Sequence, residues 1–123
     1  MKRTALFTSL ALFALLLFAN PGQEVIPLRK VKIGHSNIPM PADQPDVYYY
    51  SNNVSQTIII DGTGEVSYYD VEIMSLTTFD VLISTQANGY YDTIDISSLP
   101  EGEYVITIDA PTGNSFEGFF STY

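Results

Sequence analysis

The sequence predicts an all-β protein, an antiparallel β-sandwich of about seven strands. Short segments rich in Ile, Val, Tyr and Phe alternate apolar and polar residues, which is the two-residue period of a half-buried strand. Turn residues such as "DGTG", "ANG" and "APTGN" separate these segments at close spacing, as in sandwiches and barrels. No segment after residue 19 sustains a 3.6-residue apolar period, so we expect no long helix there.

The first nineteen residues have the features of a secretory signal peptide. Lys2 and Arg3 form a basic start, and residues 5–18 ("ALFTSLALFALLLF") carry no charge. This run is shorter than the roughly 20 apolar residues that span a bilayer, and a basic start before a short apolar run is typical of an export signal. We expect a signal-peptide helix that is cleaved after Ala19. An uncleaved anchor is the alternative, disfavoured because "NPG" at 20–22 ends the helix early.

The remainder of the chain is long enough for one domain with its own core. We divide it into an N-terminal strand with a Pro-rich connector, residues 20–53, and a β-sandwich core, residues 54–123, to which 20–53 is expected to add strands. The sequence contains no cysteine. Disulfides therefore cannot stabilise the fold, as they do in many small secreted domains, and we expect stability to come from packing.

Two segments precede the expected core. Residues 23–33 ("QEVIPLRKVKI") predict an edge strand that is broken or bulged near Pro27, because proline cannot donate to a β-ladder. Residues 34–46 contain Pro39, Pro41 and Pro45, a composition typical of an extended connector.

The core itself is predicted as a series of short strands. Their ranges are 47–50, 55–61, 67–75, 79–85, 92–97, 103–109 and 115–123, with a turn at 87–89. The run 55–61 is continuously apolar at its centre, which predicts a strand buried on both sides. Elsewhere alternation predicts the inward residues, because a strand turns successive side chains to opposite faces. These are Tyr69, Val71 and Ile73; Phe79, Val81 and Ile83; Ile94 and Ile96; and Tyr104, Ile106 and Ile108, with Glu103, Val105, Thr107 and Asp109 outward.

The exported chain is expected to be strongly acidic. The whole sequence has a net charge of −9 at pH 7, and the basic residues left after residue 19 are Arg29, Lys30 and Lys32. A nucleic-acid partner is disfavoured, because phosphate binding depends on clustered cations. Acids on the parity opposite the apolar residues are expected to face water and to discourage edge-to-edge aggregation. These are Asp80, Asp95, Glu103 and Asp109.

The sequence carries no recognisable catalytic motif. Its one histidine, His35, lies in the Pro-rich connector with no acid within seven residues, and no G-x-S-x-G segment occurs. Zinc is unsupported, because zinc sites need several His or Cys ligands. A small glycan-active hydrolase with paired carboxylates is an alternative, although a sandwich of this size offers little cleft. We expect a protein that is not an enzyme and has no cofactor.

Calcium is the one metal with a candidate loop. The segment "DGTGE" places Asp61 and Glu65 in one loop of small residues, and calcium prefers oxygen ligands. The loop lacks the spacing of acids in an EF-hand, and a plain turn between two strands explains it as well. Asp61 and Glu65 are therefore weak calcium candidates, and we predict no other metal site.

Clustered tyrosines are the candidate ligand-binding residues. Nine tyrosines occur, and most lie in runs at 48–50, 68–69 and 90–91. Adjacent strand residues face opposite sides, so each run is expected to place one ring in the core and one outside. Exposed rings could bind a glycan or a protein, because tyrosine combines a flat apolar face with a polar tip; cross-strand packing is the alternative. The surface candidates are Tyr48, Tyr49, Tyr50, Tyr90 and Tyr91.

The C-terminal segment "DTIDISSLPEGEYVITIDAPTGNSFEGFF" resembles the closing strands of C-terminal sorting domains on proteins exported by Bacteroidetes-type bacteria. Those domains run strand, "LPxGxY", strand, Gly-containing turn and final strand. The matching residues are Leu99, Pro100, Gly102, Tyr104, Gly113 and Phe119. A closer resemblance, over roughly 57–123, is to short secreted proteins of the same bacteria, which have a signal peptide and one immunoglobulin-like β-sandwich of unknown function.

This resemblance implies an immunoglobulin-like fold and says little about activity. Sorting domains typically end with Lys or Arg near the last strand, whereas "FEGFFSTY" has neither, which favours a free-standing small protein. We therefore expect an exported binding or cell-envelope module, secreted or periplasmic, with a protein or glycan partner. We expect no transmembrane span after signal cleavage. A secretion-system sorting or attachment domain is the alternative.

Overall fold

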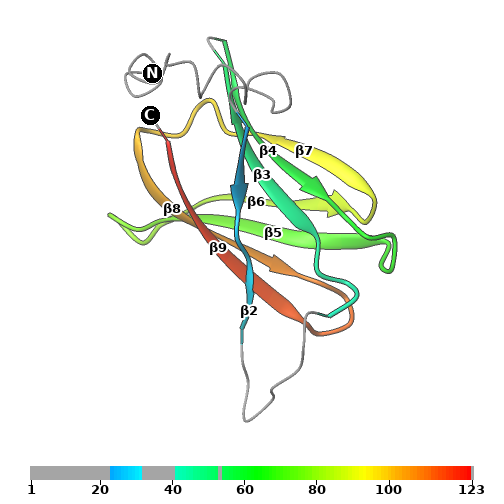
Figure 1. Ribbon diagram of the computed structural model, residues 1–123. Coiled ribbons are helices and arrows are strands. Elements are labelled where there is room, and N and C mark those ends of the chain that lie inside the picture. The colour runs from blue at the N-terminus through cyan, green and yellow to red at the C-terminus, as the bar shows by residue number, and fades with distance from the viewer. Residues whose placement is uncertain (1–22, 32–40, 53, 123) are drawn as a thin grey trace, which may run out of the picture.

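The protein is a sandwich of two antiparallel β-sheets (Figure 1). The computed structural model describes residues 23–31, 41–52 and 54–122, and all regular structure in these ranges is β. The predicted all-β sandwich is thus confirmed. The predicted signal-peptide helix and His35 lie outside the described residues. Within the described ranges, no helix has the length and apolar character needed to cross a membrane.

Sheet A has four strands in the order β1-β3-β4-β7. Their bounds are β1 (Gln23–Ile26), β3 (Asp46–Ser51), β4 (Gln56–Asp61) and β7 (Tyr91–Asp95). Sheet B has five strands in the order β2-β9-β8-β5-β6. Their bounds are β2 (Arg29–Lys30), β9 (Ser115–Thr122), β8 (Gly102–Asp109), β5 (Tyr68–Ser75) and β6 (Val81–Asn88).

The N-terminal segment crosses from one sheet to the other. β1 pairs with β3 in sheet A, and after Pro27 and Leu28 the chain continues as β2, which pairs with β9 in sheet B (Figure 1). The predicted break near Pro27 is confirmed. Gly118 of β9 leaves room for the crossing, because a Cβ there would lie 2.7 Å from Cγ2 of Ile26 and 2.9 Å from the carbonyl oxygen of Pro27.

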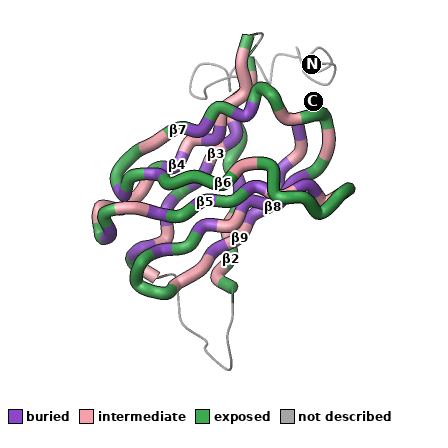
Figure 2. Tube along the Cα trace, turned by 180° about the vertical axis from the view of Figure 1, so that it is seen from behind, coloured by how far each residue is buried: buried purple, intermediate pink, exposed green. Residues whose placement is uncertain are grey.

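The core lies between the two sheets and is built from alternate residues of the strands. Buried and exposed positions alternate along β5 and β4 (Figure 2), as the two-residue period of a strand requires. The predicted inward residues of β5, β7 and β8 are confirmed. The central core residues with 0% exposure are Ile58, Ile60, Tyr69, Val71, Ile73, Ile96, Ile106, Ile108 and Phe116.

Two predictions of burial were wrong for the outer faces of the sheets. β4 is not buried on both sides: Ile58 and Ile60 are buried, while Ile59 is only partly so, because the described chain places no layer over the outer face of sheet A. Val105 has the outward parity that we predicted but is only 7% exposed. Its cross-strand neighbours on the same face are Met74 and Phe119, and these large apolar side chains shield it.

The segment 79–85 departs from its predicted pattern at its start. The strand begins at Val81, and an extra residue of β6, Leu82, bulges opposite Ile73 and Met74 of β5 and shifts the register. Phe79 lies before the strand with a positive φ of 63°. Phe79 and Val81, which we predicted to be inward, are therefore 69% and 50% exposed. The predicted turn at 87–89 is also displaced, since β6 extends to Asn88.

The "LPEGEY" segment forms a corner that a single backbone carbonyl holds. The hydroxyl groups of Tyr104 and Thr122 both donate to the carbonyl oxygen of Pro100, the second at 3.0 Å. The backbone N–H of Gly102 in turn donates to Oγ1 of Thr122 at 3.0 Å. A tyrosine near the start of a strand that bonds back to upstream backbone is the tyrosine corner of immunoglobulin-type sandwiches. The motif therefore has a structural role in this protein.

Candidate binding surface

The five candidate tyrosines separate into one core residue and four surface residues. Tyr49 is 1% exposed and lies between the sheets, where its hydroxyl donates to Oε1 of Gln56 at 2.8 Å. It is removed from the surface candidates. Tyr48 and Tyr50 flank it on β3 and lie on the opposite, outer face of sheet A, partly exposed. Tyr90 and Tyr91 are 70% and 55% exposed.

The run at 90–91 departs from the expected pattern of one ring inside and one outside. Tyr91 is the first residue of β7, but Tyr90 belongs to the turn before it. The alternation of a strand does not extend into a turn, so neither ring enters the core.

Sheet A brings three of these tyrosines onto one face. Strand register places Tyr48 beside Val25 of β1 and Ile59 of β4, and it places Tyr91 on the same face opposite Asp61. We call this outer surface of β1, β3, β4 and β7 the tyrosine face. Its apolar and aromatic members are Val25, Tyr48, Tyr50, Ile59 and Tyr91.

Val25 and Ile59 were not among the candidates. The sequence does not say which side of a strand lies against the second sheet, and this choice decides whether an apolar residue is core or surface. Their cross-strand position beside Tyr48 could have identified them only after the strand pairing was known.

Carboxylates accompany the rings on the tyrosine face. Asp46 and Asp61 are exposed and directly opposite each other on β3 and β4, and Asp95 lies near the end of β7. The side chain and backbone of Ser97 hydrogen-bond to Asp95, with a backbone N···Oδ1 distance of 2.9 Å, and lower the pKa of that carboxyl. None of the four strands contains Lys or Arg. The face thus offers flat rings and hydrogen-bond acceptors without a cation.

The candidate calcium loop is fastened to the turn that carries Tyr90. The N–H of Gly62 donates to the carbonyl oxygen of Tyr90 at 2.8 Å, and the N–H of Gly64 donates to that of Gly89 at 3.0 Å. Gly64 has a positive φ of 83°, and a Cβ there would lie 2.8 Å from Cε1 of Tyr90. The Tyr90 ring therefore lies against the loop at Gly64. Only glycine, which has no Cβ, tolerates both this close contact and the positive φ.

These contacts give the loop a structural role. Asp61 and Glu65 are both exposed. Within the part of the chain that the structure describes, no group of three or more His, Cys, Asp or Glu residues could hold a metal ion.

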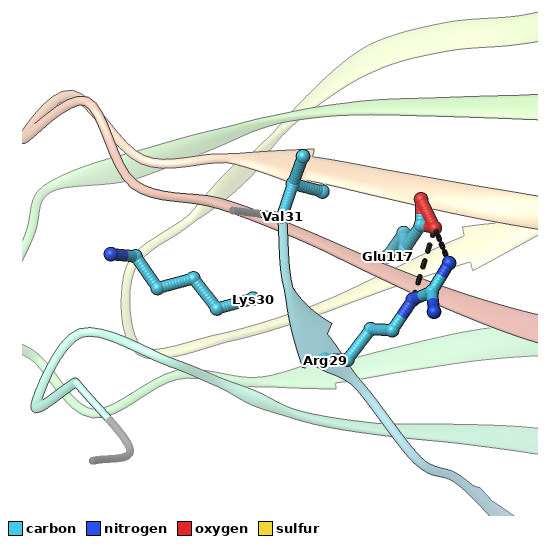
Figure 3. Close-up of a pocket in the computed structure, with 4 residues that line it drawn as sticks. All are labelled: Arg29, Lys30, Val31 and Glu117. Atoms are coloured by element: carbon cyan, nitrogen blue, oxygen red, sulfur yellow. Dashed lines mark hydrogen bonds and ion pairs between the residues drawn. The ribbon is translucent and has the colours of Figure 1, made fainter. Parts of the chain in front are cut away.

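A shallow pocket on sheet B is lined by Arg29, Lys30, Val31 and Glu117 (Figure 3). Nη2 and Nε of Arg29 donate to Oε2 of Glu117 at 2.7 and 3.2 Å, and the guanidinium lies 5.9 Å from the ring centroid of Phe119. The Arg29 side chain is 71% exposed, and ion pairs at such exposure contribute little to stability. Glu117 therefore offsets the charge of Arg29 within the pocket.

Comparison with known proteins bears on the fold. No protein-family model matches the sequence, and no curated protein sequence matches it. Among solved structures, the chain is similar to a DUF3244 family protein from Bacteroides vulgatus with an immunoglobulin-like β-sandwich fold. The TM-score is 0.63 at 13% identity, and the match covers 82% of this chain and 99% of that one. The fold is an immunoglobulin-like β-sandwich. The predicted fold class is therefore confirmed, and at this identity the similarity extends to the fold alone.

Proposed function

We propose that the chain is an exported, non-enzymatic binding module and that its tyrosine face binds a neutral glycan. The observation that carries this proposal is the placement of Tyr48, Tyr50 and Tyr91 on one sheet face. Pyranose rings present flat, apolar C–H surfaces, and an exposed tyrosine ring offers a flat apolar partner with a polar tip. The signal-like residues 1–19 support export.

The polar groups of the face fit a ligand rich in hydroxyl groups. Ionised carboxylates only accept hydrogen bonds, and Asp46, Asp61 and Asp95 offer such oxygens beside the rings. The strands of the face contribute no cation, so an anionic ligand would meet repulsion. A neutral glycan supplies the donors that these acceptors need.

The distribution of carboxylates supports binding without catalysis. A general acid in a glycosidase needs a pKa raised by burial, but Asp46 and Asp61 stand on an open, exposed face. The buried carboxylate of the described chain is Asp43, 5% exposed. It accepts hydrogen bonds from Thr112 and Asn114, which tie it to the loop between β8 and β9.

A glycan array with single alanine variants tests the proposal. Tyr48→Ala, Tyr50→Ala and Tyr91→Ala should each weaken binding by about tenfold or more, because a few aromatic residues carry most of the binding energy of an interface. The unfolding midpoint should change little. Tyr68→Ala is the matched control, since Tyr68 is a partly exposed tyrosine on the outer face of sheet B.

Two results would overturn this assignment. If the native chain binds no glycan, the ligand is not a glycan. If Tyr68→Ala loses as much binding as the three variants, the binding site is not the tyrosine face. An envelope protein captured by the native chain and lost in the three tyrosine variants would keep the face but replace the glycan by a protein.

A further inference from the structure

The free edge of sheet B is strand β6. Among the described residues, β6 pairs with β5 on one side and with no strand on the other. The N–H of Gly89 donates to the carbonyl of Ser67 at 3.0 Å, which sets the phase of the antiparallel ladder. Bonded and non-bonded pairs alternate in such a ladder. The backbone groups of Ser84 and Gln86 therefore point away from β5, toward the free side.

β6 lacks the features that protect the other edges of the sandwich. Native sheets block edge pairing with charges, proline or short strands. β1 carries Glu24, β7 carries Asp92 and Asp95, and β2 has only two residues, both basic. β6 has eight residues, "VLISTQAN", with neither a charge nor a proline, and its bulge at Leu82 lies before Ser84 and Gln86, whose pairing with β5 is regular. This edge is open to the addition of a further strand.

The start of β6 presents apolar side chains to solvent. Phe79, Val81 and Leu82 are 69%, 50% and 44% exposed. Phe79 has a positive φ of 63°, a backbone conformation that is unfavourable for a residue with a Cβ. Val81 also ends an apolar row that crosses the outer face of sheet B from Phe119 through Val105 and Met74. A strand added beside β6 would extend this row.

The two following rows of the same face are acidic. Glu72 lies beside Ser84, and Asp70 lies between Gln86 and Asp109. Like charges directly opposite each other destabilise a sheet, and no Lys or Arg of the described strands pairs with Asp70 or Asp109 in these rows. An added strand would lie about 10 Å from β5, two strand spacings away, which the long side chain of a lysine or arginine largely bridges.

We propose that β6 binds an extended segment of a partner protein, which adds a strand to sheet B. The segment has an apolar residue beside Val81 and Lys or Arg at the alternate positions beside Ser84 and Gln86. Its backbone bonds to the free groups of Ser84 and Gln86, and its cations offset the charge of Asp70 and Glu72. A second copy of this acidic chain, with a net charge of −9, is a poorer source of those cations. In its described strands the basic residues are Arg29, which is already paired with Glu117, and Lys30, both on the two-residue strand β2. This interface lies on the sheet opposite the tyrosine face.

Synthetic peptides provide the probe for this edge. Two acetylated peptides carry one leucine and two lysines at alternate positions, in opposite orders, so that parallel and antiparallel addition are both sampled. In an NMR titration at low salt, one of them should bind and protect the amides of Ser84 and Gln86 from hydrogen exchange. Peptides with glutamate in place of lysine should not bind. Asp70→Asn and Glu72→Gln should each weaken binding several-fold, and added salt should do the same.

The backbone contact is tested separately from the charge. Ser84→Pro removes an N–H that faces the free side and should weaken binding at least about tenfold, while Ser84→Ala should bind as the native chain does. Peptides N-methylated on the side that faces β6 should also fail, and this arm does not depend on the folding of a proline variant. Tyr48→Ala should bind the peptide normally. Peptide binding at β6 is thereby tested independently of glycan binding at the tyrosine face.

The proposal is overturned if neither lysine peptide binds, or if binding survives both Ser84→Pro and N-methylation, since the attraction is then electrostatic alone. It is also overturned if sedimentation shows a dimer of the native chain that Ser84→Pro dissociates. In that case the occupant of the edge is a second copy.

Discussion

The side-chain amide of Asn114 donates to both carboxylate oxygens of Asp43, each at 3.1 Å. Oγ1 of Thr112 donates to the same carboxylate at 2.5 Å, and the hydroxyl of Tyr69 donates to the backbone carbonyl of Asp43 at 2.8 Å. The chain before β3 is thereby tied to the loop between β8 and β9 and to the core. Buried polar groups without partners are costly. Here the buried carboxylate of Asp43 has hydrogen-bond donors, and the hydroxyl of buried Tyr69 has an acceptor.

Removal of the Asp43 carboxylate should destabilise the protein. Asp43→Ala removes the hydrogen bonds that this buried carboxylate accepts from half-buried Asn114 and from exposed Thr112, and a hydrogen bond to a charged group contributes about 1.5–3 kcal/mol. The free energy of unfolding in urea measures the effect. Asp46→Ala, at an exposed position three residues later, should cost less than about 0.5 kcal/mol. Equal costs at the two positions would show that the network around Asp43 does not contribute to stability.

The register of β8 makes a graded prediction for three adjacent residues. Ile106 is 0% exposed, and Ile106→Ala should cost about 2–5 kcal/mol through the cavity that it leaves. Thr107 is only partly buried and points outward, so Thr107→Ala should cost little. Val105→Ala should fall between them, because Val105 is 7% exposed on the outer face. Urea denaturation of the three variants would contradict this register if Thr107→Ala cost as much as Ile106→Ala.

Alternation alone predicted the faces of β5 and β8 correctly, because both strands are central and regular. It failed at Phe79 and Val81, where the bulge opposite Met74 and the positive φ of Phe79 change the parity of the chain. It also could not place Val105, whose burial depends on Met74 and Phe119 from neighbouring strands.

The candidate surfaces show the same limit of sequence reasoning. The runs of tyrosine suggested a platform, but only strand order joins Tyr48 of β3 with Tyr91 of β7 on one face. The free edge of β6 depends wholly on sheet order. A property that arises from pairing between distant strands is not encoded in any local pattern.

Alkaline pH should destabilise the protein through its buried tyrosines. Burial raises the pKa of Tyr69 above its ordinary value of 10.0, and burial also raises that of Tyr104. The unfolded chain then releases these protons at a lower pH than the folded chain does. The two tyrosines therefore contribute their full stabilisation below about pH 10, and the free energy of unfolding declines as the pH rises through their folded-state pKa values. Urea unfolding at a series of pH values from neutral upward measures the decline.

Tyr69→Phe is the control for this pH dependence. The variant should decline less steeply above about pH 10, since one of the titrating groups is gone. It should also be less stable at neutral pH, because it lacks the hydrogen bond to the carbonyl of Asp43. An unchanged decline in the variant would assign the alkaline instability to other groups.

The crossing of the N-terminal segment between the sheets makes Gly118 sensitive to any added side chain. A Cβ at this position would lie 2.7 Å from Cγ2 of Ile26 and 2.9 Å from the carbonyl oxygen of Pro27. The second contact is with backbone, so a rotamer change cannot relieve it, and β1 or β2 must move. Gly118→Ala should therefore cost about 1–3 kcal/mol, the range for overpacking a core.

Gly102→Ala is the matched control, since its Cβ would meet nothing closer than 4.0 Å. Hydrogen exchange should show faster exchange of the amides in β1 and β2 in Gly118→Ala but not in Gly102→Ala. If both variants lose the same stability and exchange alike, the crossing does not depend on the missing side chain.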